Sequence, residues 1–160
     1  MDDMILLGLA VIAGCTVIYS ALFSVFFRLF HWAHGRVHGR KTFLHDTAFV
    51  SVVVACLLLG NLLQVLVWGI VFVLIGAFDT LELAYYFALT SFTTVGYGNV
   101  VLTGPHAILG PLAAAHGVLM LGLSTSILFW VISTLLHPLA ERYARLYGET
   151  DEDGRQQTTP

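Results

Sequence analysis

The sequence predicts an all-α membrane protein with three transmembrane helices and one shorter re-entrant helix. Hydrophobic residues make up 58% of the 160 residues and charged residues only 11%, and the mean hydropathy is +0.84. A soluble domain of this length would carry more charged surface. Three apolar runs are each long enough to cross a bilayer, and a polar stretch separates the second run from the third.

Residues 1–30 are predicted to form a peripheral N-terminal transmembrane helix. The apolar run at 4–30 would extend for roughly 40 Å as a helix, which is enough to cross a bilayer with some tilt. Asp2 and Asp3 stand where a signal peptide would carry cations, so we expect a retained span. A voltage sensor needs several charges inside the membrane, and this run offers Arg28 alone.

Residues 31–46 are predicted to form a cytoplasmic connector rich in His and Arg. His31, His34 and His38 would share one face if the connector is helical. Such a face can bind a transition metal or respond to cytoplasmic pH. Because no carboxylate or cysteine completes a persuasive ligand set, a solvated interfacial face is the favoured interpretation.

The second span, residues 47–78, carries polar or amphipathic side chains along one face. Asn61, Gln64 and Trp68 follow one another at positions i, i+3 and i+7. Polar side chains in lipid need hydrogen-bonding partners, so we expect this face to meet protein. Holding helices together is a more plausible role for the three residues than a direct part in function.

Residues 79–92 are too short to cross the bilayer and are predicted to enter it as a re-entrant helix. Asp79 can cap the start of this helix, and Glu82 stands three residues later, which is the spacing of a capping box. The carboxyl end of the helix would point inward. Its partial negative charge would favour a cation there.

The re-entrant helix leads into an irregular polar segment that contains Thr94, Val95, Gly96, Tyr97 and Gly98. Two glycines flanking a tyrosine weaken a helix, and irregular backbone persists at membrane depth only where protein or a water-filled path satisfies it. Consecutive carbonyl groups turned toward one axis can replace the water shell of a dehydrated cation. The glycines permit the backbone angles that this arrangement requires, so we predict that this segment binds a cation through its main chain.

Residues 94–98 read TVGYG, which is the well-known filter sequence of potassium channels. From about residue 57 to residue 136 the chain resembles the pore module of that family, and we assign outer helix, pore helix, filter and inner helix to residues 47–137. The resemblance implies a homotetramer that conducts K⁺ passively, with K⁺ held by residues 94–97 and no cofactor. It also implies the inner membrane of a bacterium, because small bacterial channels share the two-helix layout.

The residues around the filter depart from the commonest family pattern. Asn99 stands where most relatives carry an aspartate, whose carboxylate bonds an aromatic donor on the pore helix. The matching donor position is Tyr86, so we expect a neutral Asn99–Tyr86 contact that braces the filter less firmly than a charged acceptor would. Thr90 occupies the place of a buried glutamate in some relatives. Thr93 directly precedes the filter and is counted with these residues as filter support.

In the last span, residues 106–137, Gly122 falls near the family's hinge glycine. His116 is an ionisable group at membrane depth, for which we expect a neutral imidazole bonded to the pore helix. If the hinge match holds, one stripe of the helix would face the pore as its lining or gate, although plain packing gives the same spacing. The stripe comprises Leu123, Ser126, Ile127, Trp130 and Thr134.

The cations give an expected orientation. They lie at the end of the first span, in the connector, and beyond the last span: Arg28, Arg36, Arg40, Lys41, Arg142, Arg145 and Arg155. By the positive-inside rule the connector and C-terminus are cytoplasmic, and the N-terminus and filter mouth face outside. Residues 138–160 are predicted to form a short cytoplasmic tail that is mostly disordered.

Other classes of function have less support. Phosphate-binding loops, nucleophile elbows and HExxH motifs are missing from the sequence, so we expect no enzyme. A net charge of −3 argues against a nucleic-acid partner. Two alternatives to a potassium channel stay open: a weakly selective cation channel, because the filter brace is neutral, and a non-conducting membrane scaffold subunit. The expected partners are further copies of the chain, the lipid bilayer and K⁺.

Overall fold

The computed structural model describes the backbone of residues 2–34 and 43–156, and the side chains within these ranges except at 26, 27, 29–34, 43–46 and 137–156. The elements in chain order are α1 (Asp2–His34), α2 (Phe43–Leu74), α3 (Leu81–Phe92), the 3-10 helix η1 (Gly104–His106) and α4 (Leu109–Gln156). Every regular element in the described ranges is helical, which confirms the predicted all-α fold class.

Three of these helices are long and apolar enough to cross a membrane. The spans are Asp2–Val25 in α1, Thr47–Leu74 in α2, and Gly104–Leu136, which covers η1 and the first part of α4. They fall where the sequence predicts transmembrane helices, so the chain is a multi-pass membrane protein. α3 has 12 residues, about 18 Å of helix, and cannot cross.

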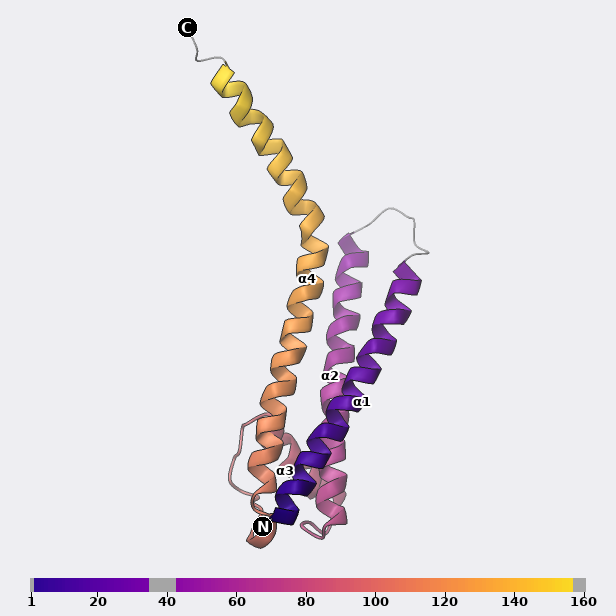
Figure 1. The fold of residues 1–160 in the computed structure, drawn as a ribbon, viewed down its shortest axis with the longest axis vertical. Helices are drawn as coiled ribbons and strands as arrows, with labels where there is room; N and C mark the ends of the chain where they lie inside the picture. Colours follow the sequence, from indigo (N-terminus) through magenta and orange to yellow (C-terminus); the bar gives the residue numbers. More distant parts are fainter. Residues whose placement is uncertain (1, 35–42, 157–160) are drawn as a thin grey trace.

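A glycine ends α2 earlier than predicted, four residues before residue 78. Gly76 adopts a left-handed φ of 71°. The N–H of Gly76 donates to the carbonyl of Val73 at 2.9 Å, and the N–H of Ala77 donates to that of Phe72 at 2.9 Å. This pair of bonds is the Schellman motif, in which a glycine satisfies the last carbonyl groups of a helix. The chain then turns back toward α3 (Figure 1).

The cap of α3 differs from the prediction. Thr80 is the N-cap residue, with extended backbone angles, and its hydroxyl accepts a hydrogen bond from the N–H of Leu83 at 3.4 Å. Asp79 therefore lies one residue outside the helix, and the predicted capping box with Glu82 does not form, because its spacing requires Asp79 as the cap. Threonine is a suitable N-cap, and the extended backbone at this position lets its hydroxyl reach the first turn.

α3 is held between α2 and α4 near the end of the molecule that carries the N-terminus (Figure 1). On the α2 side, a Cβ on Gly69 would lie 3.2 Å from the Cα of Tyr85. On the α4 side, a Cβ on Gly117 would overlap the carbonyl oxygen of Phe92, at the carboxyl end of α3. Small residues thus bring both long helices into backbone contact with α3, as is common where helices pack in membranes.

Aromatic side chains fill the space between α2 and α3. The ring centroids of Phe72 and Phe87 lie 5.4 Å apart at 70°, an edge-on arrangement. Trp68 is 5.6 Å from Phe72, and Phe78 is 5.3 Å from Phe87. Trp68 and Phe72 are fully buried. Edge-on and tilted aromatic pairs each add about 0.5–1.5 kcal/mol beyond area burial, so this cluster fixes α3 against α2.

A buried polar contact helps to hold α1 against α2 and α4. The hydroxyl groups of Tyr19 and Ser124 lie 2.9 Å apart and share a hydrogen bond. Nδ2 of Asn61 also donates to Oγ of Ser124 at 3.0 Å. Gly60 makes room for this contact, because a Cβ there would lie 2.8 Å from the Tyr19 ring. This buried contact thus holds the N-terminal span against both α2 and α4.

α4 continues far beyond the last transmembrane span, through Gln156. The sequence predicts that residues 138–160 are mostly disordered, whereas the structure has helical backbone to residue 156. This segment is rich in Ala, Leu, Arg and Glu, which favour helix when a preceding helix supplies the nucleus. α4 changes direction in its C-terminal half (Figure 1), and Pro138, which lies in that half, removes one helical hydrogen bond.

Candidate functional site

Along residues 94–98, residues with a positive φ angle alternate with residues whose φ is not positive. φ is 61° at Thr94, 50° at Gly96 and 76° at Gly98, whereas Val95 and Tyr97 have no positive φ. Glycine adopts positive φ readily, but for a β-branched residue such as Thr94 it is an outlier that costs about 1–3 kcal/mol. Strained backbone of this kind persists where the surroundings impose it, and it is concentrated at functional sites.

Two backbone hydrogen bonds fix residues 94–98, which we call the filter segment after the sequence that they resemble, to the carboxyl end of α3. The N–H of Thr94 donates to the carbonyl of Ser91 at 2.9 Å, and the N–H of Gly96 donates to the carbonyl of Thr90 at 3.1 Å. Among the described residues, none donates a hydrogen bond to a carbonyl of residues 94–98. The segment therefore has two anchored N–H groups, at Thr94 and Gly96, and carbonyl oxygens that no described donor engages. Oxygen is the ligand atom that a hard cation prefers.

The filter segment is exposed in the single protomer. Tyr97 is 73% exposed and Val95 is 52% exposed. The carboxyl end of α3 leads directly into this segment, so its partial negative charge lies beside Thr94. Main-chain carbonyl groups without a donor at membrane depth need protein or a water-filled path to satisfy them. The single protomer thus presents main-chain oxygens that no donor in the described part of the chain satisfies.

The predicted contact between Asn99 and Tyr86 is present, and it is reciprocal. The Tyr86 hydroxyl donates to Oδ1 of Asn99 at 3.2 Å, and Nδ2 of Asn99 donates to the same hydroxyl at 3.1 Å. Both groups are neutral, so each bond is weaker than one to a carboxylate would be. The contact joins the outer end of the filter segment to the middle of α3.

Thr90 and Thr93 use their hydroxyl groups within α3. The Thr90 hydroxyl donates to the carbonyl of Phe87 at 3.0 Å, and the Thr93 hydroxyl donates to the carbonyl of Leu89 at 2.7 Å. Thr90 holds residues 94–98 through its main chain instead, because its carbonyl accepts the bond from the N–H of Gly96. Thr93 is the C-cap residue of α3 and sets the direction in which the chain leaves the helix.

His116 is bonded to the outer helix and not, as the sequence analysis expects, to the pore helix. Nε1–H of Trp68 donates to Nδ1 of His116 at 3.0 Å. An accepting Nδ1 places the proton of a neutral imidazole on Nε2. The pore helix contributes a ring contact, since Phe92 lies edge-on to the imidazole with centroids 5.6 Å apart. The sequence did not indicate which neighbour would supply the donor.

The polar face of α2 meets protein, as predicted. Asn61, Gln64 and Trp68 are all buried, and Asn61 and Trp68 bond side chains of α4. Within the described part of the chain, Oδ1 of Asn61, both amide atoms of Gln64 and Nε2 of His116 have no partner. Each unsatisfied buried group costs about 1–3 kcal/mol, so this polar face is the most weakly satisfied part of the interior.

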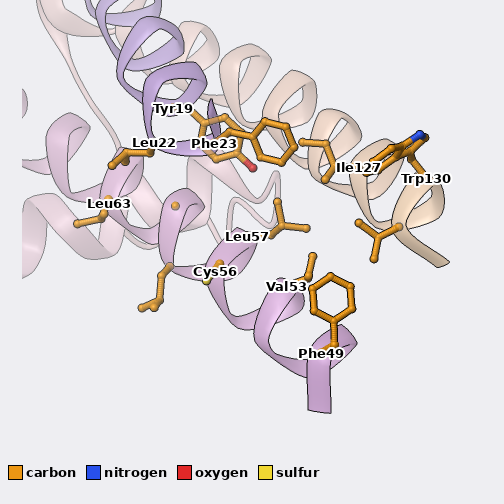
Figure 2. Close-up of a pocket in the computed structure, with 13 residues that line it drawn as sticks. Tyr19, Leu22, Phe23, Phe49, Val53, Cys56, Leu57, Leu63, Ile127 and Trp130 are labelled. Atoms are coloured by element: carbon orange, nitrogen blue, oxygen red, sulfur yellow. The ribbon is translucent and has the colours of Figure 1, made fainter. Parts of the chain in front are cut away.

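Gly122 lies in continuous helix, where a Cβ would meet no atom of the protomer within 4 Å. Leu123, Ser126 and Thr134 are exposed, and Trp130 is half exposed. Ile127 is partly buried, and Ile127 and Trp130 both border a pocket between α1, α2 and α4 (Figure 2). A single protomer has no pore axis, so the hinge and the pore lining stay predictions.

The histidine cluster of the connector falls outside the described side chains. The backbone at His31 and His34 belongs to the end of α1, and His38 lies in the range 35–42, which is not described. Among the described residues, no group of three or more His, Cys, Asp or Glu is arranged to hold a metal ion. The metal and pH hypotheses for these histidines therefore stay open.

A comparison with known protein families matches the part of the chain that contains α3 and residues 94–98. Residues 60–134 match the family described as "Ion channel". The match begins in α2, includes α3 and the filter segment, and ends in α4, while α1 lies outside it. No curated protein matched the chain, and no solved structure matched it. We call the matched segment, residues 60–134, the ion-channel domain after the family that it is similar to.

Proposed function

We propose that this ion-channel domain is a potassium-selective pore, which conducts K⁺ passively when four copies of the chain assemble around an axis. The observation that supports the proposal most directly is the backbone of the TVGYG segment. Positive φ at residues 94, 96 and 98 alternates with ordinary φ at 95 and 97, and one of the positive values belongs to a threonine. A sequence with no requirement at this place would not hold a threonine in that conformation.

When the sign of φ alternates along the backbone, successive carbonyl groups can point toward the same side. In a regular β-strand, successive carbonyl groups point to opposite sides. A row of carbonyl oxygens on one side can take the place of the water molecules around K⁺ as the ion enters. Neighbouring ions then repel one another, so that each ion leaves as another arrives. The Thr94 hydroxyl adds an oxygen at the inner end of the row.

The number four comes from the resemblance of the TVGYG sequence to potassium channels, and the geometry supports assembly from several copies. The row of oxygens in one protomer can surround an ion on one side only. The exposed Tyr97 and Val95 side chains leave the segment without outer support until neighbouring copies pack against it. Four identical copies around one axis close the ring of carbonyl groups, as TVGYG segments do in potassium filters.

The positive-inside rule supports an orientation for this pore. It would lie in a bacterial inner membrane with the N-terminus and the filter mouth outside and the C-terminus in the cytoplasm. α3 and the filter segment enter from the end of the molecule that also holds the N-terminus (Figure 1). In this orientation, K⁺ reaches the outer end of the filter near Tyr97 and leaves it near Thr94.

A flux assay in liposomes tests the proposal. Purified full-length protein is reconstituted, and uptake of ⁸⁶Rb⁺ is measured against a gradient of unlabelled K⁺, with Na⁺ as competitor. We expect uptake that K⁺ blocks and Na⁺ does not. Gly96→Ala serves as the control, because φ of 50° at this position strains any residue with a Cβ, and it should abolish uptake.

The other outcomes separate the alternatives. Uptake that Na⁺ blocks as well as K⁺ would favour a weakly selective cation channel, for which the neutral Asn99–Tyr86 contact is the supporting observation. No uptake by correctly assembled protein across the tested pH and voltage range would favour a non-conducting scaffold. Sizing of the purified protein by mass distinguishes a failure to assemble from a failure to conduct.

A further inference from the structure

A pocket of about 230 Å³ lies between α1, α2 and α4 (Figure 2). We call it the lateral pocket and define it by Tyr19 and Phe23 of α1, Val53 and Leu57 of α2, and Ile127 of α4. All three helices contribute residues from their transmembrane spans, so the pocket lies at membrane depth. α1 forms one of its walls, and the ion-channel domain by itself would not enclose it.

The lining of the lateral pocket is almost entirely apolar. None of its lining residues is Asp, Glu, Lys or Arg. The hydroxyl of Tyr19, which is one of the few polar groups, is already engaged with Ser124 at 2.9 Å. A polar or charged ligand would therefore lose hydrogen bonds on entry and gain none, which costs several kcal/mol.

An open apolar pocket at this depth borders the hydrocarbon of the bilayer. If the pocket were empty, its lining would lose dispersion contacts that packed side chains otherwise make. Its volume is below the ~300–1,000 Å³ of pockets that hold drug-sized ligands, which suits one hydrocarbon chain and not a whole lipid. We propose that one acyl chain of a membrane phospholipid occupies the lateral pocket and packs against α1 and α4.

The charge around the pocket indicates that the acyl chain, and not the headgroup, determines binding. Arg28, at the end of the same span, is the nearest cation on α1 among the described residues. It lies nine residues after Tyr19, which places it about 180° around the helix from the pocket wall at 100° per residue. Phospholipids with equal chains and different headgroups should therefore bind alike.

The proposal concerns the lateral pocket between α1, α2 and α4, and it does not rest on ion selectivity. The walls of the pocket come from one protomer, so each chain carries a complete site. A side chain from a neighbouring copy is the competing occupant. The structure of the assembled protein shows whether an acyl chain or a neighbouring side chain fills the lateral pocket.

Native mass spectrometry of the full-length protein tests the proposal. The protein is delipidated in detergent and titrated with dioleoyl phosphatidylcholine or dioleoyl phosphatidylglycerol. We expect one retained phospholipid per chain, with affinities for the two lipids within about threefold of each other, a difference of well under 1 kcal/mol. No retained lipid, or a large preference for the anionic lipid, would overturn the proposal.

Variants that fill the lateral pocket from α1 and from α2 provide a second test of the proposal. Cys56→Trp on α2 and Leu22→Trp on α1 both place an indole at the pocket lining. Each should weaken lipid retention at least about tenfold, equivalent to 1.4 kcal/mol. Leu58→Trp is the matched control, because Leu58 is 57% exposed on α2 and does not border the pocket. Equal loss in the control, or unchanged retention in both pocket variants, would overturn the proposal.

A density map of the assembled protein in lipid nanodiscs gives an independent result. We expect a rod of density between Tyr19 and Ile127 that continues outward to the bilayer. A side chain of a neighbouring protomer in this place would overturn the proposal. Because this test reads occupancy and not current, its outcome is independent of the flux assay above.

Discussion

Nε1–H of Trp68 donates a hydrogen bond to Nδ1 of His116 at 3.0 Å, and both side chains are fully buried. The bond joins the outer helix α2 to the inner helix α4 at the level where the pore helix ends, because Phe92 packs edge-on against the same imidazole. Three elements, α2, α3 and α4, thus meet at one histidine.

Trp68→Phe should destabilise the protein by about 1–3 kcal/mol, because it leaves Nδ1 of His116 buried without a donor. The double variant Trp68→Phe/His116→Leu removes both partners, and we expect it to lose less stability than the two single changes together. Thermal unfolding of the purified protein in one detergent measures all three variants. Losses that simply add would contradict a direct bond between the two side chains.

Gly117→Ala should disrupt the filter, because the added methyl group would overlap the Phe92 carbonyl oxygen at the end of α3. Backbone cannot yield there without moving the start of the filter segment, so we expect K⁺ flux to fall at least about tenfold, about 1.4 kcal/mol in the barrier. The measurement is ⁸⁶Rb⁺ uptake by reconstituted, correctly sized protein.

Gly14→Ala in α1 is the matched control for this change, because Gly14 lies outside residues 60–134. A Cβ at Gly14 meets nothing within 4 Å in the protomer. The variant should therefore fold, assemble and conduct like the wild type, and alanine at a helix interior is favoured over glycine by up to about 1 kcal/mol. Uptake by Gly117→Ala equal to that of the wild type would contradict the close approach.

Tyr86→Phe should speed slow inactivation of the current. One hydroxyl carries both bonds to Asn99, so its removal frees the outer end of the filter from α3. Losing about 1 kcal/mol of bracing corresponds to roughly a fivefold change in rate. Voltage-clamp recording of the current decay during a long step gives the rate.

Asn99→Asp should act in the opposite direction, because a carboxylate accepts a stronger hydrogen bond from the Tyr86 hydroxyl. The decay should be slower than in the wild type. Adding Tyr86→Phe to Asn99→Asp should remove that gain. Decay rates that stay the same in both single variants would show that the Asn99–Tyr86 contact does not brace the filter.

Tyr19→Phe should loosen α1 from the ion-channel domain. It removes the bond to Ser124 and keeps the ring that packs on Gly60, so we expect a loss of about 0.5–1.5 kcal/mol. Amide hydrogen exchange should rise in α1 and stay constant in α3. A matched change without this bond, Tyr85→Phe, should leave exchange in α1 unchanged. Equal exchange in Tyr19→Phe and the wild type would contradict the role of the contact.

The helices of this fold could be predicted from the sequence because each rests on a local pattern. The three spans follow from runs of apolar residues, and α3 follows from its shortness and its place before TVGYG. The Asn99–Tyr86 contact was predictable because a resemblance supplied the pairing. Positive φ at Gly96 and Gly98 was expected from the residue type.

Features that depend on long-range packing were missed or assigned to the wrong partner. The cap of α3 is Thr80 and not Asp79, a difference of one residue that depends on how the chain leaves α2. His116 bonds Trp68, because Phe92 of the pore helix presents only its ring. The close approach of Gly117 to Phe92 had a signal in the sequence, a glycine within a transmembrane span, which marks a helix contact but does not name the partner.

The most direct test of the central claim, that the main chain of residues 94–98 selects K⁺, is a planar-bilayer recording with KCl on one side and NaCl on the other. We expect the current to reverse far from zero, toward the K⁺ equilibrium potential, with a K⁺/Na⁺ permeability ratio of at least about ten, or 1.4 kcal/mol between the two barriers. A reversal potential at zero in protein whose mass shows four copies would contradict the claim.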